Sequence, residues 1–519
     1  MKVRFADRRP KALRMRRIVG EAVEAAKQSG PRRFVAAMFG ICLLPLLSGC
    51  IVGTEKPDVA IAVPPTYRYA APAVKSPVPA LDWWRGFRSP ELTALIEEAQ
   101  TANLDIAAAI ARVEQADAQA KIAGATLFPT VDLNATATRS RPSQATSSTG
   151  STGGGGPSER TLYNVAFRAS YEIDFWGKNR ATLLAAEQNA VAFRFAREVV
   201  TLSTVATVSN TYFLVVSAQD RLRIARENVR SAERILKLIR DRVAAGTASA
   251  LDAAQQETVL ATQRASVPVF EQLIRQNKIL LGVLLGQPPE YITVRGGDLA
   301  RLGIPRVTPG LPSELLCQRP DIRQAEAQLA SASANVEAAR AAFFPSIQLT
   351  GDGGWQSAAL KMLFTPASAF YNITSSLTQP IFDGFRLEGQ LELQKGRQEE
   401  LLQLYRRAIV AGFGDVENAL IALQQSTIRE RLTREAVTSA RRAFELSETR
   451  LREGTTDLIT LLNTQLSLFQ AQDAVSQAQL ARLQAAVALF QALGGGWAPN
   501  ILPVACGEEA KEIALPVKG

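Results

Sequence analysis

Cys50 is the residue whose type and setting point most directly to a chemical reaction. It follows a leader in which a pair of arginines precedes an apolar stretch over 34–47, and then Ser48 and Gly49. The stretch is too short to span a bilayer comfortably, so it is typical of a secretory leader. In a bacterial lipobox of this kind the cysteine thiol receives diacylglycerol and becomes the new N-terminus after cleavage. We therefore expect Cys50 to be lipidated, with an ordinary signal peptide and a chance cysteine as the alternative.

The remaining chemistry-bearing residues argue against an enzyme. Cys317 and Cys506 could form a disulfide in an oxidising compartment, although their spacing alone does not show it. The sequence contains no histidine, which removes the commonest general base and the commonest metal ligand. It also contains no Cys-x-x-Cys pair, Gly-rich phosphate loop or nucleophile elbow. We expect no catalytic residue, no metal and no cofactor.

The net charge of +10 belongs mostly to the leader. Residues 1–49 contain eleven Lys and Arg against three acidic residues, which leaves the rest of the chain close to neutral at +2. The mature part therefore has no basic footprint for nucleic acid. The initiating methionine is either Met1 or Met15, and Met15 would leave a leader of more ordinary length.

An internal duplication dictates the architecture. Apolar and small residues spaced three and four apart lead twice to a Phe-Pro pair: Ile106, Ala109, Val113, Ala116, Ala120, Ala123, Leu127 and Phe128-Pro129, then Ile322, Ala325, Leu329, Ala332, Val336, Ala339, Phe343 and Phe344-Pro345. Two Gly-Thr pairs, 246–247 and 454–455, precede the Leu-Gly pairs 285–286 and 493–494 by the same spacing. Each copy therefore has the order helix, strand, loop, strand, very long helix, turn, long helix.

Periodicity predicts the elements of both copies. In the first we expect helices over 92–99 and 103–127, strands over 131–139 and 162–175 around a flexible loop at 143–157, and helices over 178–244 and 249–285 kinked at Pro268. In the second we expect a strand beginning at 346–349, a connection over 351–370, a strand over 371–382, and helices over 385–453 and 457–493. The longest helices would measure about 100 Å and carry heptad spacing.

The strands, not the helices, are expected to cross a membrane. The helices carry charges every turn or two, and we expect no segment after the leader to offer about 18 uncharged apolar residues. Strands of about ten residues are long enough to span a bilayer when tilted. One chain has only four of them, too few to close a barrel, so several chains must contribute. Three chains give 12 strands, whereas two give eight and little lumen.

The second copy carries the motifs that identify a family. The chain resembles the TolC-like outer membrane efflux factors through 319–326, Asn335, Ala339-Arg340 and 343–346, and it resembles their NodT-type lipoprotein branch through the lipobox, Trp83-Trp84, 173–177 and 415–420. Ile51 follows the lipobox cysteine where an inner-membrane retention signal would show Asp, which also resembles an outer-membrane lipoprotein. The resemblance covers about residues 50–500.

The resemblance implies a mainly α fold with a membrane β-barrel: a homotrimeric channel-tunnel with long antiparallel coiled-coil helices and a trimeric 12-stranded barrel. Partners would be a periplasmic membrane fusion (adaptor) protein, an inner-membrane transporter of the resistance–nodulation–division (RND) class, and outer membrane lipid. A duct for another export route and a non-conducting periplasmic scaffold remain alternatives. The implied domains are a signal peptide (1–49), a lipid-anchored tether (50–81), a first repeat (82–285), an equatorial linker (286–318), a second repeat (319–494) and an equatorial C-terminal tail (495–519).

The resemblance also places a gate just after the Gly-Thr turns. The matching positions are Asp252 in the first copy and Ile459, Thr460 and Asn463 in the second. Relatives commonly carry carboxylates at one or both of the last two positions, which are neutral here, so a constriction by Ile459 with Asn463 hydrogen bonds is favoured over an acidic ring. Plain helix capping is the alternative for Asp252 and for Asp457.

The remaining expectations concern the tip and the helix-to-barrel junctions. Arg450, Arg452 and Asp457 could form inter-helix ion pairs, each contributing little if exposed. The exposed tip residues would dock the adaptor, and prolines and glycines would be structural hinges where helix becomes barrel: Gly246, Thr247, Gly454 and Thr455 at the tip, and Pro129, Pro345, Gly177 and Gly384 at the hinges.

Overall fold

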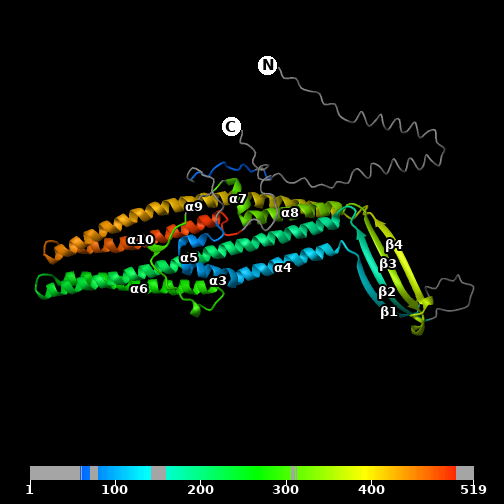
Figure 1. Ribbon diagram of the computed structural model, residues 1–519, viewed down its shortest axis with the longest axis horizontal. Helices are drawn as coiled ribbons and strands as arrows, with labels where there is room; N and C mark the ends of the chain where they lie inside the picture. The colour runs from blue at the N-terminus through cyan, green and yellow to red at the C-terminus, as the bar shows by residue number, and fades with distance from the viewer. Residues whose placement is uncertain are drawn as a thin grey trace, which may run out of the picture.

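The computed structural model describes residues 59, 61–69, 80–141, 159–305, 310 and 312–497. They form a long rod of helices with a four-stranded sheet at one end and two helical hairpin tips at the other (Figure 1). The expected leader, Met1 and Met15, the lipidation site Cys50, the loop at 143–157 and Cys506 lie outside the described residues. Cys317 is disulfide-bonded.

The three longer helices of each copy repeat the same lengths, as the duplication predicts, whereas the first helix has 13 residues in the first copy and 7 in the second. The first copy contains α3 (Pro90–Ala102), α4 (Leu104–Ala125), α5 (Lys178–Ala244) and α6 (Ala250–Leu284), and the second contains α7 (Pro312–Gln318), α8 (Pro320–Ala341), α9 (Arg386–Arg452) and α10 (Leu458–Ala492). Adding 216 to both bounds of α4 gives those of α8. Adding 208 to the bounds of α5 and α6 gives those of α9 and α10. Pro268 lies inside α6, which continues on both sides of it, and the kink stays a prediction.

One antiparallel sheet joins the two copies in the order β1-β2-β3-β4. Its strands are β1 (Thr130–Ser140), β2 (Arg160–Ile173), β3 (Ser346–Ser357) and β4 (Ala369–Thr378). The expected connection over 351–370 is wrong at its start, because β3 continues through three glycines to Ser357 by pairing with β2 on one side and β4 on the other. β4 also ends at Thr378 rather than at residue 382, since β3 begins at Ser346, opposite Thr378, and offers nothing beyond it.

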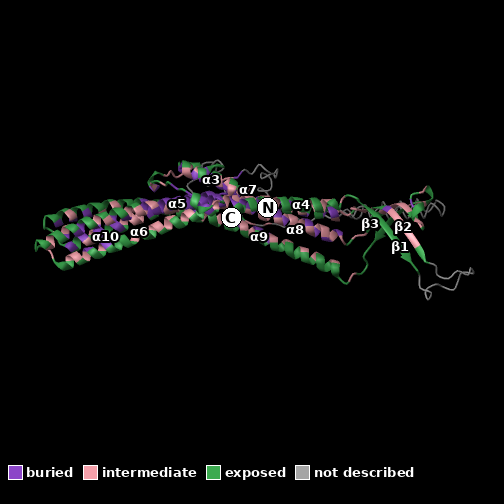
Figure 2. Ribbon diagram, turned by 90° about the horizontal axis from the view of Figure 1, so that it is seen from below, coloured by how far each residue is buried: buried purple, intermediate pink, exposed green. Residues whose placement is uncertain are grey.

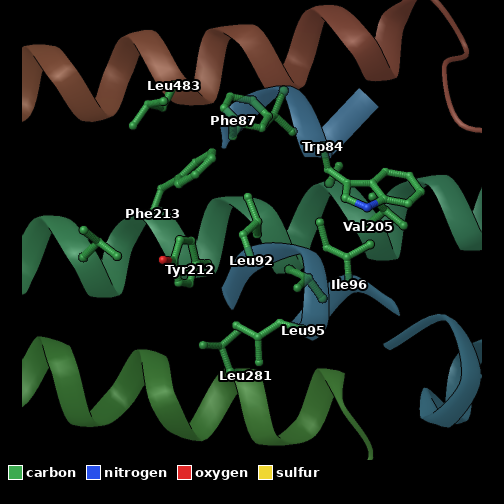
Figure 3. Close-up of a cluster of buried hydrophobic side chains, with 14 of the residues drawn as sticks. Trp84, Phe87, Leu92, Leu95, Ile96, Val205, Tyr212, Phe213, Leu281 and Leu483 are labelled. Atoms are coloured by element: carbon green, nitrogen blue, oxygen red, sulfur yellow. The ribbon is translucent and has the colours of Figure 1, made fainter. Parts of the chain in front are cut away.

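The largest apolar core lies midway along the rod, where short elements wrap the long helices (Figure 3). Trp84 and Phe87 of η1 (Trp83–Phe87) and Leu92 of α3 pack against α5, α6 and α10. Trp83 stacks on Phe490 with ring centroids 4.7 Å apart and an interplanar angle of 11°. Figure 2 shows that burial follows stripes along the helices, whereas the sheet is mostly exposed or half-buried.

This core explains one wrong expectation. α5 contains an 18-residue window that is apolar enough, and poor enough in charge, to cross a membrane by length and composition. Within the structure 56 % of that window is buried. Residues of α5 such as Val208, Phe213 and Val216 are fully buried in the central core, so helix packing already accounts for this apolar stretch.

The family motif at 319–321 is a structural junction. Arg319 is 9 % exposed and donates to Asp321 at 2.7 Å, to Asp415 of α9 at 2.9 Å and to the carbonyl oxygen of Ala492 at 3.1 Å. One guanidinium thereby ties the start of α8 to α9 and to the end of α10, with the planar, multi-donor geometry that suits arginine.

The segment before the first helix is fastened to α9. The carboxylate of Glu417 accepts hydrogen bonds from the backbone nitrogens of Arg68 at 2.6 Å and Tyr69 at 3.3 Å. The Tyr67 side chain is 5 % exposed and packs with Leu315 and Val416. The described part of the expected tether, 61–69, therefore lies along the middle of the rod.

Candidate functional site

Two matching turns close the hairpins at the far end of the rod, where α5 meets α6 and α9 meets α10 (Figure 1). Gly246 and Gly454 both have φ of +74°, a conformation that favours glycine. The backbone nitrogen of Thr247 donates to the carbonyl of Arg242 at 2.9 Å, and that of Thr455 donates to the carbonyl of Arg450 at 2.9 Å. These are Schellman-type helix ends.

The threonines of the two turns have a local structural role. Each threonine hydroxyl also donates to the same carbonyl as its backbone nitrogen, at 3.1 Å in the first turn and 3.2 Å in the second. All four glycine and threonine residues of the turns are exposed. The Gly-Thr pairs therefore build two identical exposed tips.

The carboxylates beside the tips cap the returning helices. Asp252 and Ser249 form a capping box at the start of α6, with bonds of 2.8 and 3.2 Å. Asp457 accepts from the Thr460 backbone nitrogen at 2.9 Å at the start of α10. Hydrogen bonds from Thr460, first from its side chain and then from its backbone, lower the pKa of Asp457. Capping, the alternative weighed from the sequence, is what the structure gives both residues.

The other gate candidates lie on one exposed face of α10. Ile459 is 58 % exposed, and Thr460 and Asn463 are exposed as well. Leu466, one heptad after Ile459, is 52 % exposed and continues this face. Leu466 was not among the residues predicted from the sequence, although its heptad spacing from Ile459 is a signal that could have found it.

Within one chain Arg452, one of the residues expected to form inter-helix ion pairs, has its partner on its own helix. Arg452 pairs with Glu448, one turn earlier on its own helix, at 2.5 Å. The tips are joined instead by Arg242 of α5, which donates to the carbonyl of Leu451 in α9 at 2.9 Å. A helix C-terminus presents unpaired carbonyls, so a cation from the neighbouring hairpin is a favourable partner.

Two further contacts join the hairpins between the tips and the middle of the rod. Gln256 and Gln465 are fully buried, and the Gln256 side-chain nitrogen lies 3.4 Å from the Gln465 side-chain oxygen and 3.2 Å from the carbonyl of Ala232. Farther from the tips, Arg221 of α5 pairs with Asp473 of α10 at 2.6 Å. Neither contact was foreseen, because periodicity identifies a helix face but not its partner helix.

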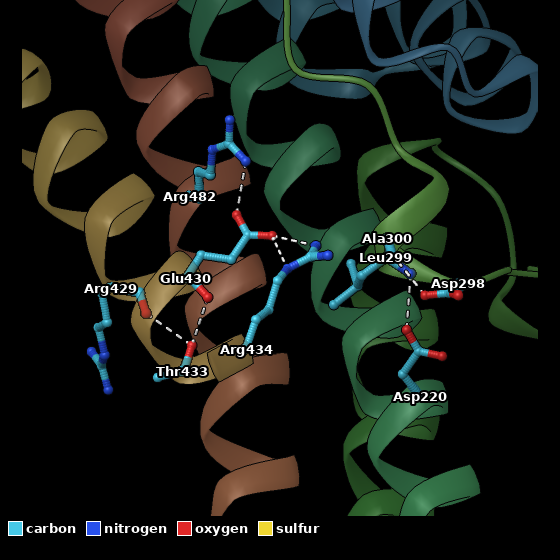
Figure 4. A network of polar contacts seen from close by, with 9 residues as sticks. All are labelled: Asp220, Asp298, Leu299, Ala300, Arg429, Glu430, Thr433, Arg434 and Arg482. Carbon is cyan, nitrogen blue, oxygen red and sulfur yellow. Dashed lines mark hydrogen bonds and ion pairs between the residues drawn. The ribbon is translucent and has the colours of Figure 1, made fainter. Parts of the chain in front are cut away.

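Buried charges lie between the tips and the central core (Figure 4). Glu430 of α9 is 6 % exposed and accepts from Arg434 at 2.6 Å and from Arg482 of α10 at 2.8 Å. Asp220 of α5 is 5 % exposed, accepts from the Leu299 backbone nitrogen at 2.9 Å, and has its pKa raised by burial. Across the described ranges, no three or more His, Cys, Asp or Glu gather in a way that could hold a metal ion.

The four expected hinges lie where helices and strands meet. Pro129 and Pro345 each directly precede a strand, β1 and β3. Gly177 and Gly384 have φ of +81° and +69°. Phe385, directly after Gly384, is the N-cap of α9 with φ of +66°, a strained conformation for a residue with a side chain.

Trp176 joins the two copies at the junctions between helices and strands. Its ring stacks on Phe344 at 4.7 Å, and its Nε1 donates to the carbonyl of Pro345 at 2.8 Å. Beyond the presence of the aromatic residues, nothing in the sequence signalled this contact.

Comparison with known proteins decides the family. The outer membrane efflux protein family model matches residues 95–287 and 311–495. The chain belongs to this family. The pyoverdine export outer membrane protein OpmQ of Pseudomonas putida is 40 % identical over 460 residues, which cover 88 % of this chain and 97 % of that protein. The probable outer membrane lipoprotein SilC of Salmonella typhimurium is 31 % identical over 478 residues, 89 % of this chain and 99 % of SilC.

A solved structure of this family agrees with the fold. The outer-membrane channel OprN matches with a TM-score of 0.80 at 27 % identity, covering 86 % of this chain and 98 % of OprN. This outer membrane efflux protein therefore has the TolC-like architecture of long helices and a membrane sheet, and it is an efflux channel protein of the outer membrane. Its family consists of transporters rather than enzymes.

Proposed function

We propose that three copies of this outer membrane efflux protein form one channel, in which 12 strands close a barrel and the helices continue it into the periplasm. The observation that carries this proposal is the open sheet: β1 and β4 each have one unpaired edge and are exposed along nearly their whole length. Backbone groups left unpaired in a lipid core are very unfavourable, so the edges need partners. Three copies of a four-stranded sheet give 12 strands, within the range of known membrane barrels.

The channel would serve as the exit duct of a tripartite pump. The adaptor would dock on the exposed turns at Gly246-Thr247 and Gly454-Thr455, and an RND transporter in the inner membrane would supply the energy. The identical geometry of the two turns supports this, because a trimer would present six equivalent tips around one axis.

The gate would lie where the exposed face of α10 meets its copies near the tips. Ile459 and Asn463 would form the constriction, with Asp252, Thr460, Asp457 and Arg452 around it. The exposure of Ile459 and Leu466 supports this assignment, since an apolar helix face without a partner in one chain requires another cover. The prolines and glycines at 129, 345, 177 and 384 would be the hinges between helix and barrel.

Cys50 would carry the lipid anchor. The lipobox and the similarity to the lipoprotein SilC support this. Intact-mass measurement of the membrane-extracted protein should give a diacylated chain beginning at Cys50, and C50S should shift the protein to an unlipidated form. An unmodified cysteine in the wild-type protein would favour the ordinary signal peptide.

The cargo would include pyoverdine or a molecule like it. The OpmQ protein, named for pyoverdine export, shares 40 % identity over nearly its whole length. A deletion strain should lose secretion of its pyoverdine-like compound and recover it on complementation. Unchanged secretion together with a new drug or metal sensitivity would show another export route.

Planar bilayers test the channel itself. Purified protein should give single-channel currents, and its mass in detergent, corrected for bound detergent, should equal three chains. A periplasmic scaffold would give no conductance, and a monomer would contradict the trimer.

A further inference from the structure

The two open edges of the sheet are the strongest unpartnered surface of the chain. Large apolar side chains gather at both of them, and several lie at the ends nearest the helices. Their exposed fractions are 64 % for Val131, 70 % for Phe128, 90 % for Ile381, 80 % for Phe382 and 70 % for Phe385. The internal duplication allows the partner of each edge residue to be worked out.

One numerical rule relates the two copies of the fold. Adding 216 to a residue of α4 or β1 gives its counterpart in α8 or β3, and adding 208 to a residue of α5 or α6 gives its counterpart in α9 or α10. The hairpin registers show that β2 and β4 are also related by 208. Thr130 lies opposite Ser170 in the first hairpin, and their counterparts Ser346 and Thr378 lie opposite each other in the second.

The same rule can be applied to the junction between the copies. Within the chain, β2 of the first copy pairs with β3 of the second copy. In a closed ring the next junction joins β4 of this chain to β1 of a second chain. In that junction β4 is the counterpart of β2, and β1 of the second chain is the counterpart of β3. Ile173 lies opposite Ile347, and Ala166 lies opposite Gly354. Shifting these pairs by 208 and by minus 216 gives Ile381 opposite Val131 and Thr374 opposite Thr138 of the second chain.

We infer that β4 pairs with β1 of a second copy of this chain in this register, with Thr374 directly opposite Thr138. This inference rests on the proposed trimer and adds the residue-by-residue seam between its subunits. The seam would continue toward the helices to Phe128 and Phe385, at the level where Trp176 stacks on Phe344 inside one chain.

Side-chain alternation independently supports this register against one shifted by a single residue. Directly opposite residues of antiparallel strands share one face of the sheet. In this register every second residue of β1 from 134 to 140 is polar and faces a polar residue of β4. On the other face Val131 and Ala135 lie opposite Ile381 and Leu377, and the remaining pairs there each join a polar or charged residue to an apolar one: Leu133 with Gln379, Ala137 with Ser375 and Arg139 with Ile373. A shift by one residue would place Ile381 opposite Asp132 and mix the lipid and lumen faces along the seam.

Cysteine pairs can measure the register. Opposite residues have Cα atoms about 4.5–5.5 Å apart, within reach of a disulfide, whereas diagonal neighbours roughly 7–8 Å apart are not. Under mild oxidation T138C/T374C should give covalent dimers and trimers on non-reducing gels. The matched pairs T136C/T374C and S140C/T374C, shifted by two residues in either direction, should give at least tenfold less product.

An internal control shows that position 374 can react. T350C/T374C joins residues that are opposite within one chain, so it should form an intrachain disulfide and block thiol labelling. The parent chain gives the background from its native cysteines. Each variant is also weighed by native mass spectrometry before oxidation.

The outcomes separate the seam from the trimer. Trimeric variants that cross-link best through T136C or S140C, or through none of the three inter-chain pairs while T350C/T374C reacts, would overturn the register and leave the trimer standing. A monomeric parent chain would overturn the trimer, and the seam with it.

Discussion

The two helical hairpins have the same length and different stabilising contacts. Hairpin 1, α5 with α6, carries three exposed ion pairs between its helices: Arg226–Glu271 at 2.9 Å, Arg240–Glu257 at 2.6 Å and Arg264–Glu233 at 2.7 Å. In hairpin 2, α9 with α10, the counterparts of the three α6 charges are all glutamine, namely Gln465, Gln472 and Gln479. Its single described inter-helix ion pair is Arg482–Glu430.

Hairpin 2 has the larger apolar side chains at four matched positions near its tip, whereas hairpin 1 has the larger ones at Ile235 and Ile239, whose counterparts are Ala443 and Ser447. The apolar cluster in the half of hairpin 2 nearest its tip contains Phe444, Leu451, Leu461 and Phe469. The first-copy counterparts are smaller at each position: Leu236, Val243, Ala253 and Ala261. Both hairpins bury apolar side chains, since Ile235 and Ile239 of hairpin 1 lie in the same cluster. Hairpin 1 adds exposed ion pairs at the positions where hairpin 2 has glutamines, and such pairs contribute little compared with apolar burial.

The largest effect should come from removing an apolar side chain of hairpin 2. Leu461 is fully buried, and L461A gives hairpin 2 the alanine that hairpin 1 has at the matching position 253. We expect a loss of about 2–5 kcal/mol, because a cavity remains after the transfer term is lost. Thermal unfolding of the detergent-solubilised protein measures it, with L446A, at an exposed position of α9, as the control. Equal destabilisation by both changes would contradict the contrast between the hairpins.

The gate assignment gives hairpin 2 the main role in closing the pore, with Asp252 of hairpin 1 beside it. I459A on hairpin 2 should raise the single-channel current, and D252A/I459A should raise it several-fold, because both changes widen the proposed constriction. L251A, an exposed residue next to Asp252, is the control and should leave the current unchanged. Wild-type currents in both gate variants would sink the assignment.

The fold was largely predictable from the sequence, because helix ends are local features. Glycines at positive φ marked the limits of α5, α6, α9 and α10, which were predicted to within one or two residues. Contacts between distant elements were not predictable. The glycines of β3 indicated a loop until pairing on both sides made them a strand, and neither Gln256 with Gln465 nor Trp176 with Phe344 carries a signal in the sequence.

The helix caps provide a smaller and pH-dependent difference. S249A should lower the stability of hairpin 1 by about 1 kcal/mol, because it removes the hydroxyl that caps α6. Since a hydroxyl does not titrate in this range, the loss should be the same at every pH. The corresponding cap of hairpin 2 is Asp457, whose pKa is lowered in the folded protein. Its contribution is therefore complete above the ordinary carboxyl pKa of about 4 and is lost as the pH falls through the lower folded value.

Hydrogen exchange of the α10 N-terminus measures this difference. Protection there should weaken on acidification below about pH 4 in the wild-type protein, after correction for intrinsic exchange. In D457N, where an amide oxygen can still accept the Thr460 bond, that pH dependence should be absent. The same dependence in D457N would assign it to another group.

The smallest effect should come from the ion pairs of hairpin 1. E257Q/R264Q/E271Q gives α6 the three glutamines of α10, and each exposed pair is worth about 0.2–1 kcal/mol. Exchange protection of α6 should therefore fall slightly at low salt. The triple variant and the wild-type protein should converge near 1 M salt, where the Debye length is about 3 Å. The amides of residues 458–469 at the tip end of α10 provide the internal control, since no ion pair is described there. If α6 and α10 lost protection equally with salt in the wild-type protein, the charges of hairpin 1 would not be what distinguishes it.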